Sequence, residues 1–154
     1  MGVLAVAHDA ARKRALDVRD YRLLSDFRYL LRRFLEFSEA AAVKAGLTVR
    51  QHQALLAIKG APAGTVPTIG YLAERLRIHH HSAVELTDRL VQADLATREP
   101  DSADRRRVRL TLTRSAERHL AVLATDHLLE LRRLRPALLD ILREIDTNPD
   151  GRQP

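Results

Sequence analysis

The sequence contains no cysteine and no tryptophan, and aromatic residues make up only 4% of it. Without cysteine, the chain forms no disulfide, thiolate metal site or thiol redox switch. With so few aromatic side chains, its core must consist of Leu, Ala, Val and Ile. Long apolar runs are absent too, because stretches such as Leu120–Ala124 fall far short of the ~20 residues that span a bilayer. No membrane association is therefore expected.

Signatures of catalysis and of targeting are also lacking. There is no HExxH motif, and Gly60 and Gly64 bracket a proline, so they form no phosphate-binding loop. No local pattern marks a nucleophile, so neither an enzyme nor a cofactor is expected. The apolar start of the chain has no basic region and is interrupted by His8 and Asp9, which argues against a signal peptide. The expected location is the cytoplasm.

The residues that are present indicate one soluble, basic domain over residues 1–154. Hydrophobic residues make up 45% and charged residues 30% of the chain, as in ordinary globular domains. Basic residues outnumber acidic residues by 26 to 20, giving a net charge of +6. Since Lys13, Lys44 and Lys59 are the only lysines, nearly all of the positive charge is carried by arginine.

The first half of the chain predicts helices. Apolar residues recur at helical spacing over Leu23–Leu35, which predicts a long amphipathic helix over about 21–46 that ends at Gly46. Thr48 and Gln51 have capping-box spacing and predict a second helix to about residue 59. A connector follows, with at most a short strand at residues 65–67. Thr68 suits the start of a third helix.

A fourth helix is expected after a break at Arg77 and Ile78, running to about residue 93. Residues 96–99 and 108–112 then alternate as strands do, around a polar loop, and predict a β-hairpin with a long tip. Helical spacing returns from residue 113, and Pro136 suits the first turn of a separate last helix. Residues 146–154 are expected to form a disordered tail. This order predicts a mainly α fold with a small hairpin, in the layout of a winged helix-turn-helix.

The hairpin tip is strongly basic. It carries Arg105, Arg106, Arg107 and, just beyond, Arg109. The planar guanidinium group donates several hydrogen bonds at once and suits phosphate oxygens and narrow grooves. A solvated basic turn, partly neutralised by neighbouring aspartates, is the alternative. Because the loop follows a predicted helix-turn-helix, contact with double-stranded DNA is favoured.

The start of the fourth helix is the second candidate for DNA contact. Helix N-termini bind phosphate through unpaired N–H groups and the positive end of the helix dipole. Further along a polar face, a glutamate suits cytosine and an arginine suits guanine or phosphate. An ordinary solvent-exposed helix face is the alternative. The candidate residues on this helix are His79, His80, His81, Ser82, Glu85 and Arg89.

Two other functions remain open from the residues alone. The basic loop fits an acidic protein partner, in which case the chain is a winged-helix interaction module. The three consecutive histidines also raise the hypothesis of a metal-dependent sensor, although neighbours on a helix point ~100° apart and cannot converge on one ion; no metal site is predicted. His52 and His127 lie on apolar stripes and are interpreted as buried histidines with hydrogen-bond partners.

Three segments resemble the MarR family of bacterial transcriptional regulators: Ile69–Ile78, Ser82–Leu90 and Asp104–Thr113. The specific parts are the Asp-x-Arg of the wing (Asp104 and Arg106), the Leu-Thr that ends its second strand, and the Asp-Arg-Leu late in the fourth helix. Similarity in order and length covers about residues 21–145, and the motifs lie within about 65–113. Each motif is weak by itself, but their combination in this order is specific.

The resemblance implies a homodimer formed by helices over about 21–46 and 114–145, with a DNA-binding lobe over about 48–113. It also implies a repressor that a small aromatic or phenolic ligand releases from DNA. Arg106 would enter the minor groove with Asp104 bracing it, and the helix from His79 to Arg89 would enter the major groove. Tyr29, Phe34 and His52 are candidates for the ligand pocket.

The sequence departs from the family pattern in two places. Arg77 stands where many members have glycine in the turn between the third and fourth helices, so the turn is strained if it requires a positive φ. The histidines at 79–81 replace the small polar residues usual there. The first departure affects turn geometry, and the second affects the preferred DNA sequence.

Overall fold

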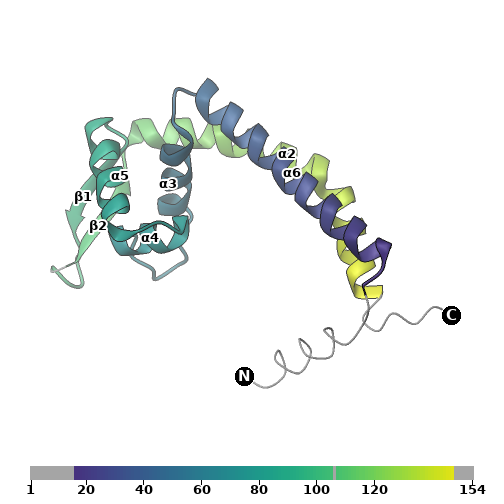
Figure 1. Ribbon diagram of the computed structural model, residues 1–154. Coiled ribbons are helices and arrows are strands. Elements are labelled where there is room, and N and C mark those ends of the chain that lie inside the picture. Colours follow the sequence, from purple (N-terminus) through teal and green to yellow (C-terminus); the bar gives the residue numbers. More distant parts are fainter. Residues whose placement is uncertain (1–15, 106, 148–154) are drawn as a thin grey trace, which may run out of the picture. The chain divides into compact units, whose positions relative to one another are not determined.

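The computed structural model describes residues 16–105 and 107–147 (Figure 1). Interpretations that concern the start of the chain, Arg106 and residues 148–154 therefore lie outside the described residues. The elements are the helices and strands α2 (Val18–Lys44), α3 (Val49–Lys59), α4 (Ile69–Leu76), α5 (His80–Gln92), β1 (Ala96–Pro100), β2 (Val108–Leu112) and α6 (Arg114–Thr147). Among the described helices, none is both long and apolar enough to cross a membrane. The mainly α fold with a small hairpin is confirmed.

The chain divides into two compact units. One comprises residues 37–127, with α3, α4, α5, the hairpin and the adjoining parts of α2 and α6. The other, over the described residues 16–36 and 128–147, contains the remaining parts of α2 and α6, which line one groove. The predicted helix-turn-helix and hairpin therefore lie within one unit, which we call the lobe.

The lobe has a core made almost wholly of aliphatic side chains. Leucines that are fully or nearly fully buried come from α3 (Leu55), α4 (Leu72), α5 (Leu86 and Leu90) and β2 (Leu110). Burying one such side chain stabilises the fold by about 1.5–3 kcal/mol. The aliphatic core expected from the shortage of aromatics is present.

The predicted helix ends are confirmed in atomic detail. Thr48 Oγ1 accepts a hydrogen bond from the Gln51 N–H at 3.1 Å, and Gln51 Oε1 accepts one from the Thr48 N–H at 2.8 Å, completing the capping box of α3. Thr68 Oγ1 accepts from the Tyr71 N–H at the start of α4. After α2, Gly46 has φ +77°, the left-handed conformation expected at a helix C-terminus.

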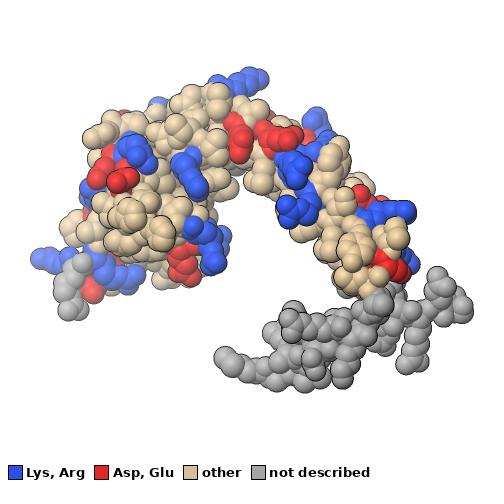
Figure 2. Space-filling model, in the orientation of Figure 1, with Lys and Arg blue, Asp and Glu red and all other residues tan. Residues whose placement is uncertain are grey.

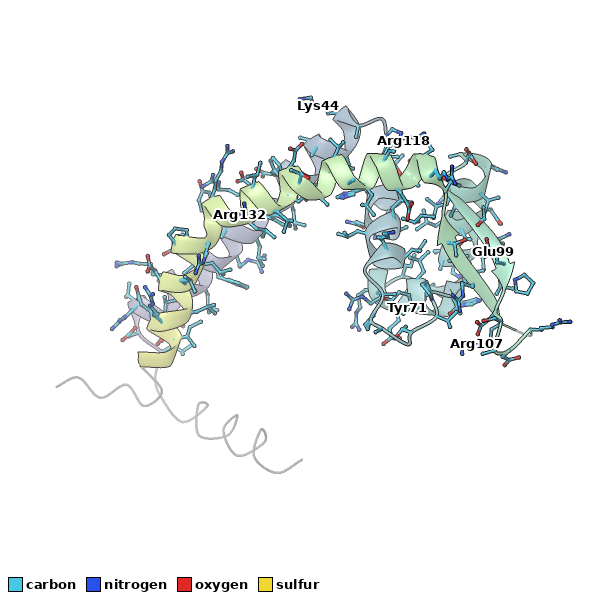
Figure 3. All side chains as sticks on the ribbon, turned by 180° about the vertical axis from the view of Figure 1, so that it is seen from behind. Lys44, Tyr71, Glu99, Arg107, Arg118 and Arg132 are labelled. Carbon is cyan, nitrogen blue, oxygen red and sulfur yellow. The ribbon has the colours of Figure 1, made fainter. Side chains whose placement is uncertain are left out.

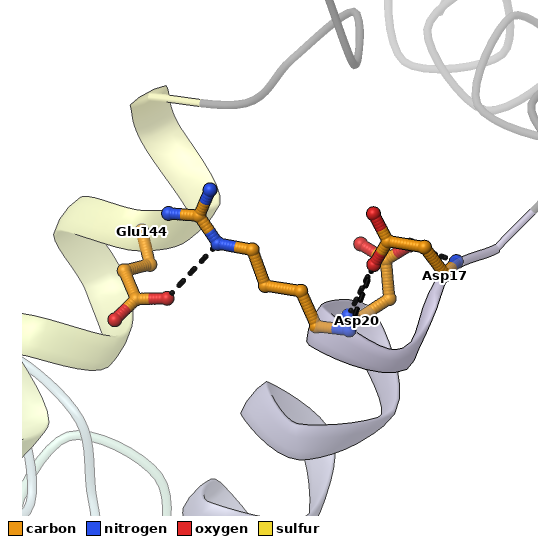
Figure 4. A network of polar contacts seen from close by, with 4 residues as sticks. Asp17, Asp20 and Glu144 are labelled. Carbon is orange, nitrogen blue, oxygen red and sulfur yellow. Dashed lines mark hydrogen bonds and ion pairs between the residues drawn. The ribbon is translucent and has the colours of Figure 1, made fainter. Parts of the chain in front are cut away.

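The start of α2 has an acidic cap. Asp17 Oδ1 accepts from the Arg19 and Asp20 N–H groups at 2.8 and 3.1 Å, and Asp20 Oδ2 accepts from the Asp17 N–H at 2.9 Å. Arg19 then donates through Nε to Glu144 Oε2 of α6 at 3.3 Å (Figure 4). Because both side chains of this pair are about half exposed, at 53% and 46%, it contributes little to stability.

The hairpin occupies almost the predicted residues. Its antiparallel register pairs Ala96 with Leu112 and Pro100 with Val108. Residues 65–67 form no strand, contrary to the possibility raised by the sequence. A single backbone hydrogen bond, from the Leu110 N–H to the Pro67 oxygen at 2.7 Å, ties that segment to β2.

The separate last helix predicted at Pro136 is wrong, because α6 runs without a break from Arg114 to Thr147. An internal proline costs about 3 kcal/mol through a lost hydrogen bond and a steric clash. Leu134 and Ile141 lie on either side of it and are buried, at 8% and 6% exposure. Their burial is worth about as much as the proline costs, or more. Asp146 and Thr147, assigned to a tail, belong to α6.

The two histidines interpreted as separate buried residues lie against each other. The ring centroids of His52 (α3) and His127 (α6) are 4.7 Å apart, and the residues are 3% and 8% exposed. His127 Nδ1 lies 2.6 Å from the Leu123 oxygen, and its Nε2 lies 2.9 Å from Ser38 Oγ. Burial, and secondarily the neighbouring His127, lower the pKa of His52.

This pair predicts acid sensitivity of the fold. A histidine whose pKa is lowered in the folded state binds its proton more readily when unfolded. Its contribution to stability is therefore fully present above the ordinary pKa of about 6.5 and is lost as the pH falls below that value. The slope per group is at most about 1.4 kcal/mol per pH unit. Chemical denaturation between pH 5 and 8 should show this slope in the wild type and a smaller one in His52→Gln.

His119→Gln, which changes an exposed histidine on α6, is the matched control and should keep the wild-type slope. Equal slopes in the wild type and His52→Gln would contradict the assignment. All samples are compared at one protein concentration.

Arg77 is strained in the way that its departure from the family pattern suggested. It has φ +54° and ψ +45° at the C-terminus of α4, and its N–H donates to the Glu74 oxygen. The Ile78 N–H donates to the Ala73 oxygen at 3.0 Å, which closes the turn before α5. A left-handed conformation costs a non-glycine residue about 1–2 kcal/mol.

Arg77→Gly should therefore stabilise the chain, because glycine adopts this conformation without a steric penalty. We expect a gain of about 1 kcal/mol after allowance for the greater entropy of the unfolded glycine chain. Asp94 also has a positive φ, of +52°, but aspartate tolerates it better. Thermal unfolding should thus show a larger gain for Arg77→Gly than for the control Asp94→Gly; the reverse order would refute the strain.

Candidate nucleic-acid interface

Helix α5 begins with exposed imidazoles and has no side-chain cap. His79 is the N-cap residue, with φ −67° and ψ 152°, and its side chain makes no capping hydrogen bond. His79, His80 and His81 are all exposed, and the rings of His79 and His81 stack with centroids 5.6 Å apart. Ser82 is half-buried. The His79 side chain therefore does not compete with a ligand for the backbone N–H groups of the first turn.

The two faces of α5 differ sharply. Ala83, Leu86 and Leu90 are buried in the core of the lobe. Glu85 and Arg89, four residues apart, are exposed together on the other side, where the sequence placed them. One face of α5 is therefore held by the core, and the opposite face presents hydrogen-bonding groups outward.

The loop of the hairpin presents its arginines to solvent. Arg105 and Arg107 are exposed, Asp104 is half-buried, and Arg106 lies outside the described residues. Arg107 lies at the loop end of the hairpin (Figure 3), and basic side chains gather there on the surface (Figure 2). The Asp101 N–H donates to the Arg107 oxygen and the Arg107 N–H to the Asp104 oxygen, both at 2.9 Å, so the loop is internally bonded.

An ion pair at the base of this loop was not predicted from the sequence. Asp101 is 1% exposed, and its Oδ1 accepts a hydrogen bond from Arg109 Nη2 at 2.9 Å. The hydrogen bond from Arg109 holds the pKa of Asp101 below its ordinary value even though burial acts in the opposite direction. The signal that could have revealed this pair is the hairpin register. Pro100 pairs with Val108, which makes Asp101 the diagonal neighbour of Arg109.

Helix α5 and the hairpin are joined chiefly by their shared apolar core, beside which lie one largely exposed ion pair and one backbone hydrogen bond. Arg98 of β1 forms an ion pair with Asp88 of α5, with Nη2 and Oδ1 2.5 Å apart. The Leu95 N–H donates to the Leu90 oxygen at 2.9 Å, and the leucines of both elements share the core. The start of α5 and the arginine loop are therefore two exposed features of one packed unit.

The predicted ligand-pocket residues do not come together within one unit. Tyr29 lines a groove of about 450 Å³ between α2 and α6, where the Arg33 guanidinium lies 5.9 Å from the centroid of its ring. Phe34 is half-buried in the same unit. His52 belongs to the lobe and is buried against His127.

The histidine run forms no metal cluster with any other described residue. Over residues 16–105 and 107–147, no group of three His, Asp or Glu side chains is arranged to hold a metal ion. The stacked rings of His79 and His81 face each other. The hypothesis of a metal-dependent sensor gains no support from this geometry.

Comparison with known proteins agrees with this architecture. Residues 45–107 match the family model described as the MarR family. No curated protein sequence matches the chain. Solved structures do.

The chain is similar to AbsC, a MarR family transcriptional regulator from Streptomyces coelicolor, with 21% identity and a TM-score of 0.66, covering 90% of this chain and 94% of AbsC. It is also similar to an S. aureus MepR F27L mutant bound to an oligodeoxyribonucleotide, with 17% identity and a TM-score of 0.59, covering 84% of this chain and 99% of that one. A third similar structure is CouR from Rhodococcus jostii RHA1 bound to p-coumaroyl-CoA, with 19% identity and a TM-score of 0.61, covering 86% of this chain and 97% of CouR. Residues 45–107 therefore match the MarR family model, and the chain has the winged-helix fold seen in solved MarR family transcriptional regulators.

Proposed function

We propose that this protein is a transcriptional regulator that binds double-stranded DNA in a sequence-specific manner. The observation that carries the proposal is that one packed lobe exposes both the start of α5 and an arginine-rich hairpin loop. Major grooves admit an α-helix, and narrow minor grooves attract arginine. The MepR structure with an oligodeoxyribonucleotide supports this role by similarity of fold.

In this proposal the two features have different tasks. Helix α5 enters the major groove and reads base edges through His80, His81, Glu85 and Arg89, while His79 and Ser82 lie near phosphates. The loop contacts phosphates and the minor groove through Arg105 and Arg107, together with Arg106 braced by Asp104 as the family resemblance implies. Phosphate contacts position the lobe, and base contacts give the sequence preference.

We also propose that the protein is a homodimer. In the unit that contains residues 16–36 and 128–147, large apolar side chains remain exposed on α2, including Leu24 (59%) and Leu35 (52%), and on α6, including Leu128 (56%) and Ile145 (55%). Apolar surface of this extent marks an interaction site. Pairing across a two-fold axis would cover it and set two α5 helices ~34 Å apart, the spacing of successive major grooves.

Sedimentation equilibrium of the full chain at micromolar concentration should give a mass of about twice 17.4 kDa. Leu24→Glu together with Leu35→Glu should shift the mass toward the monomer, since each places a charge in the proposed interface. Arg118→Glu, an exposed change in the lobe, is the control. A monomeric wild type would contradict the dimer.

We further propose that the protein is a repressor, which a small aromatic or phenolic ligand releases from DNA. The structure of CouR bound to p-coumaroyl-CoA supports the proposal of a small-molecule ligand, by similarity of fold. Tyr29, Phe34 and His52 remain its candidate contacts. An acidic protein partner for the loop has no specific observation in its favour.

Selection of bound duplexes from random DNA, followed by affinity measurements, tests the DNA-binding proposal. The wild type should enrich a two-fold related motif. Arg107→Ala should weaken binding to all duplexes alike and reduce the slope of log affinity against log salt by about 1, because it removes one phosphate contact. His80→Ala should instead change the preferred sequence, by about 1–3 kcal/mol of discrimination at the bases it reads.

Arg132→Ala, an exposed arginine of α6 outside the lobe, is the matched control and should change neither quantity. Failure of the wild type to bind any duplex at low salt would refute the function. Equal effects of Arg107→Ala and His80→Ala on all sequences would refute the division of tasks.

A further inference from the structure

Among the described residues of the hairpin, two arginines form ion pairs, and these two pairs differ in the burial of the aspartate. Arg98 pairs with Asp88 of α5, and the two side chains are 37% and 48% exposed. Arg109 pairs with Asp101, and here the arginine is 38% exposed but the aspartate only 1%. The first pair is largely solvated, whereas the second holds a carboxylate away from water.

Asp101 lies buried at the base of the loop, and its two carboxylate oxygens differ in their contacts. Its Oδ1 accepts from Arg109, while its Oδ2 is buried with no hydrogen-bond partner among the described residues. Its own N–H donates to the Arg107 oxygen, so the same residue closes the loop through its backbone. A buried carboxylate that loses its cation leaves an uncompensated charge, which destabilises the folded loop around it. The order of the loop therefore depends on Arg109.

Arg109 does not bond to the carboxylate that lies directly across the hairpin from it. Its cross-strand partner is Glu99, whose Oε1 instead accepts from the hydroxyl groups of Thr97 and Thr111 at 3.4 and 3.2 Å. Arg109 turns diagonally to Asp101. Its guanidinium is thus engaged within the protein, unlike the exposed arginines at 105 and 107.

We infer that Asp101 and Arg109 are positioning residues that together fix the arginine loop in the conformation that binds DNA, and that Arg109 itself makes no phosphate contact. The inference rests on the proposed function and deepens it. It assigns two different roles to arginines that the sequence presents as one basic cluster. It also gives an acidic residue a favourable effect on DNA binding.

The sign of the effect makes the inference testable. By charge alone, removing an aspartate beside a DNA-binding loop strengthens binding to a polyanion. Positioning requires the opposite, so Asp101→Ala should weaken binding to the selected duplex by roughly tenfold or more. Arg109→Ala should weaken it by a similar factor with the salt slope of the wild type. The double variant should be no weaker than either single variant, because the two residues act as a unit.

Asp88→Ala, Arg98→Ala and their double variant form the matched control cycle on the same hairpin. Each should change affinity by less than about fivefold, as expected for an exposed pair. Arg109→Lys keeps a cation beside Asp101 and should recover part of the lost affinity. Melting temperatures of all variants identify any that fail to fold, and Arg109→Lys then carries the test.

Trypsin cleavage after Arg105 or Arg107, located by mass spectrometry, reports on loop order without DNA. It should be faster in Asp101→Ala and Arg109→Ala than in the wild type or the control variants. Unchanged cleavage, equal or tighter DNA binding by Asp101→Ala, or a lower salt slope in Arg109→Ala would each overturn the inference. If the wild type itself binds no DNA, the proposed function fails, which the cleavage rates distinguish from a failure of the pair alone.

Discussion

The packing of leucines from α5 and the hairpin into one core fixes these two elements relative to each other. Leu86 and Leu90 of α5 and Leu110 of β2 are almost completely buried in the same cluster. With one face of each element held there, the opposite faces are directed outward as a fixed pair. In the proposed function, the exposed histidines and arginines can contact one DNA duplex together because this core holds the two elements in one unit.

Much of the lobe follows from local sequence rules. Thr48 with Gln51, Thr68 and Gly46 set helix ends through contacts within a few residues, and such contacts can be predicted from spacing. The exposed positions of Glu85 and Arg89 follow from the helical period in the same way. Pro136 obeys the same kind of rule, yet the prediction failed there. Burial of Leu134 and Ile141 against another element outweighs the local cost, and no local pattern reveals that burial.

Features that depend on distant residues were harder to predict. The ion pair of Asp101 and Arg109 requires both the register of the hairpin and the depth at which the aspartate is buried. The contact of His52 with His127 joins helices far apart in the chain, and periodicity alone indicated only that each is buried. Arg77 lies between these cases. Its position in a turn was predictable, and the structure supplied the positive φ that makes the turn strained.

The most direct measurement uses the absence of cysteine from the chain. Single-cysteine variants Glu85→Cys and Arg105→Cys each carry an iron chelate that cleaves nearby DNA, one on the outer face of α5 and one on the loop. On a selected duplex, we expect cuts from residue 85 within a half-site and cuts from residue 105 displaced beside it, repeated in the second half-site. Cleavage from only one of the two positions, or cuts scattered evenly along the duplex, would contradict the claim that one lobe places both features on the same DNA.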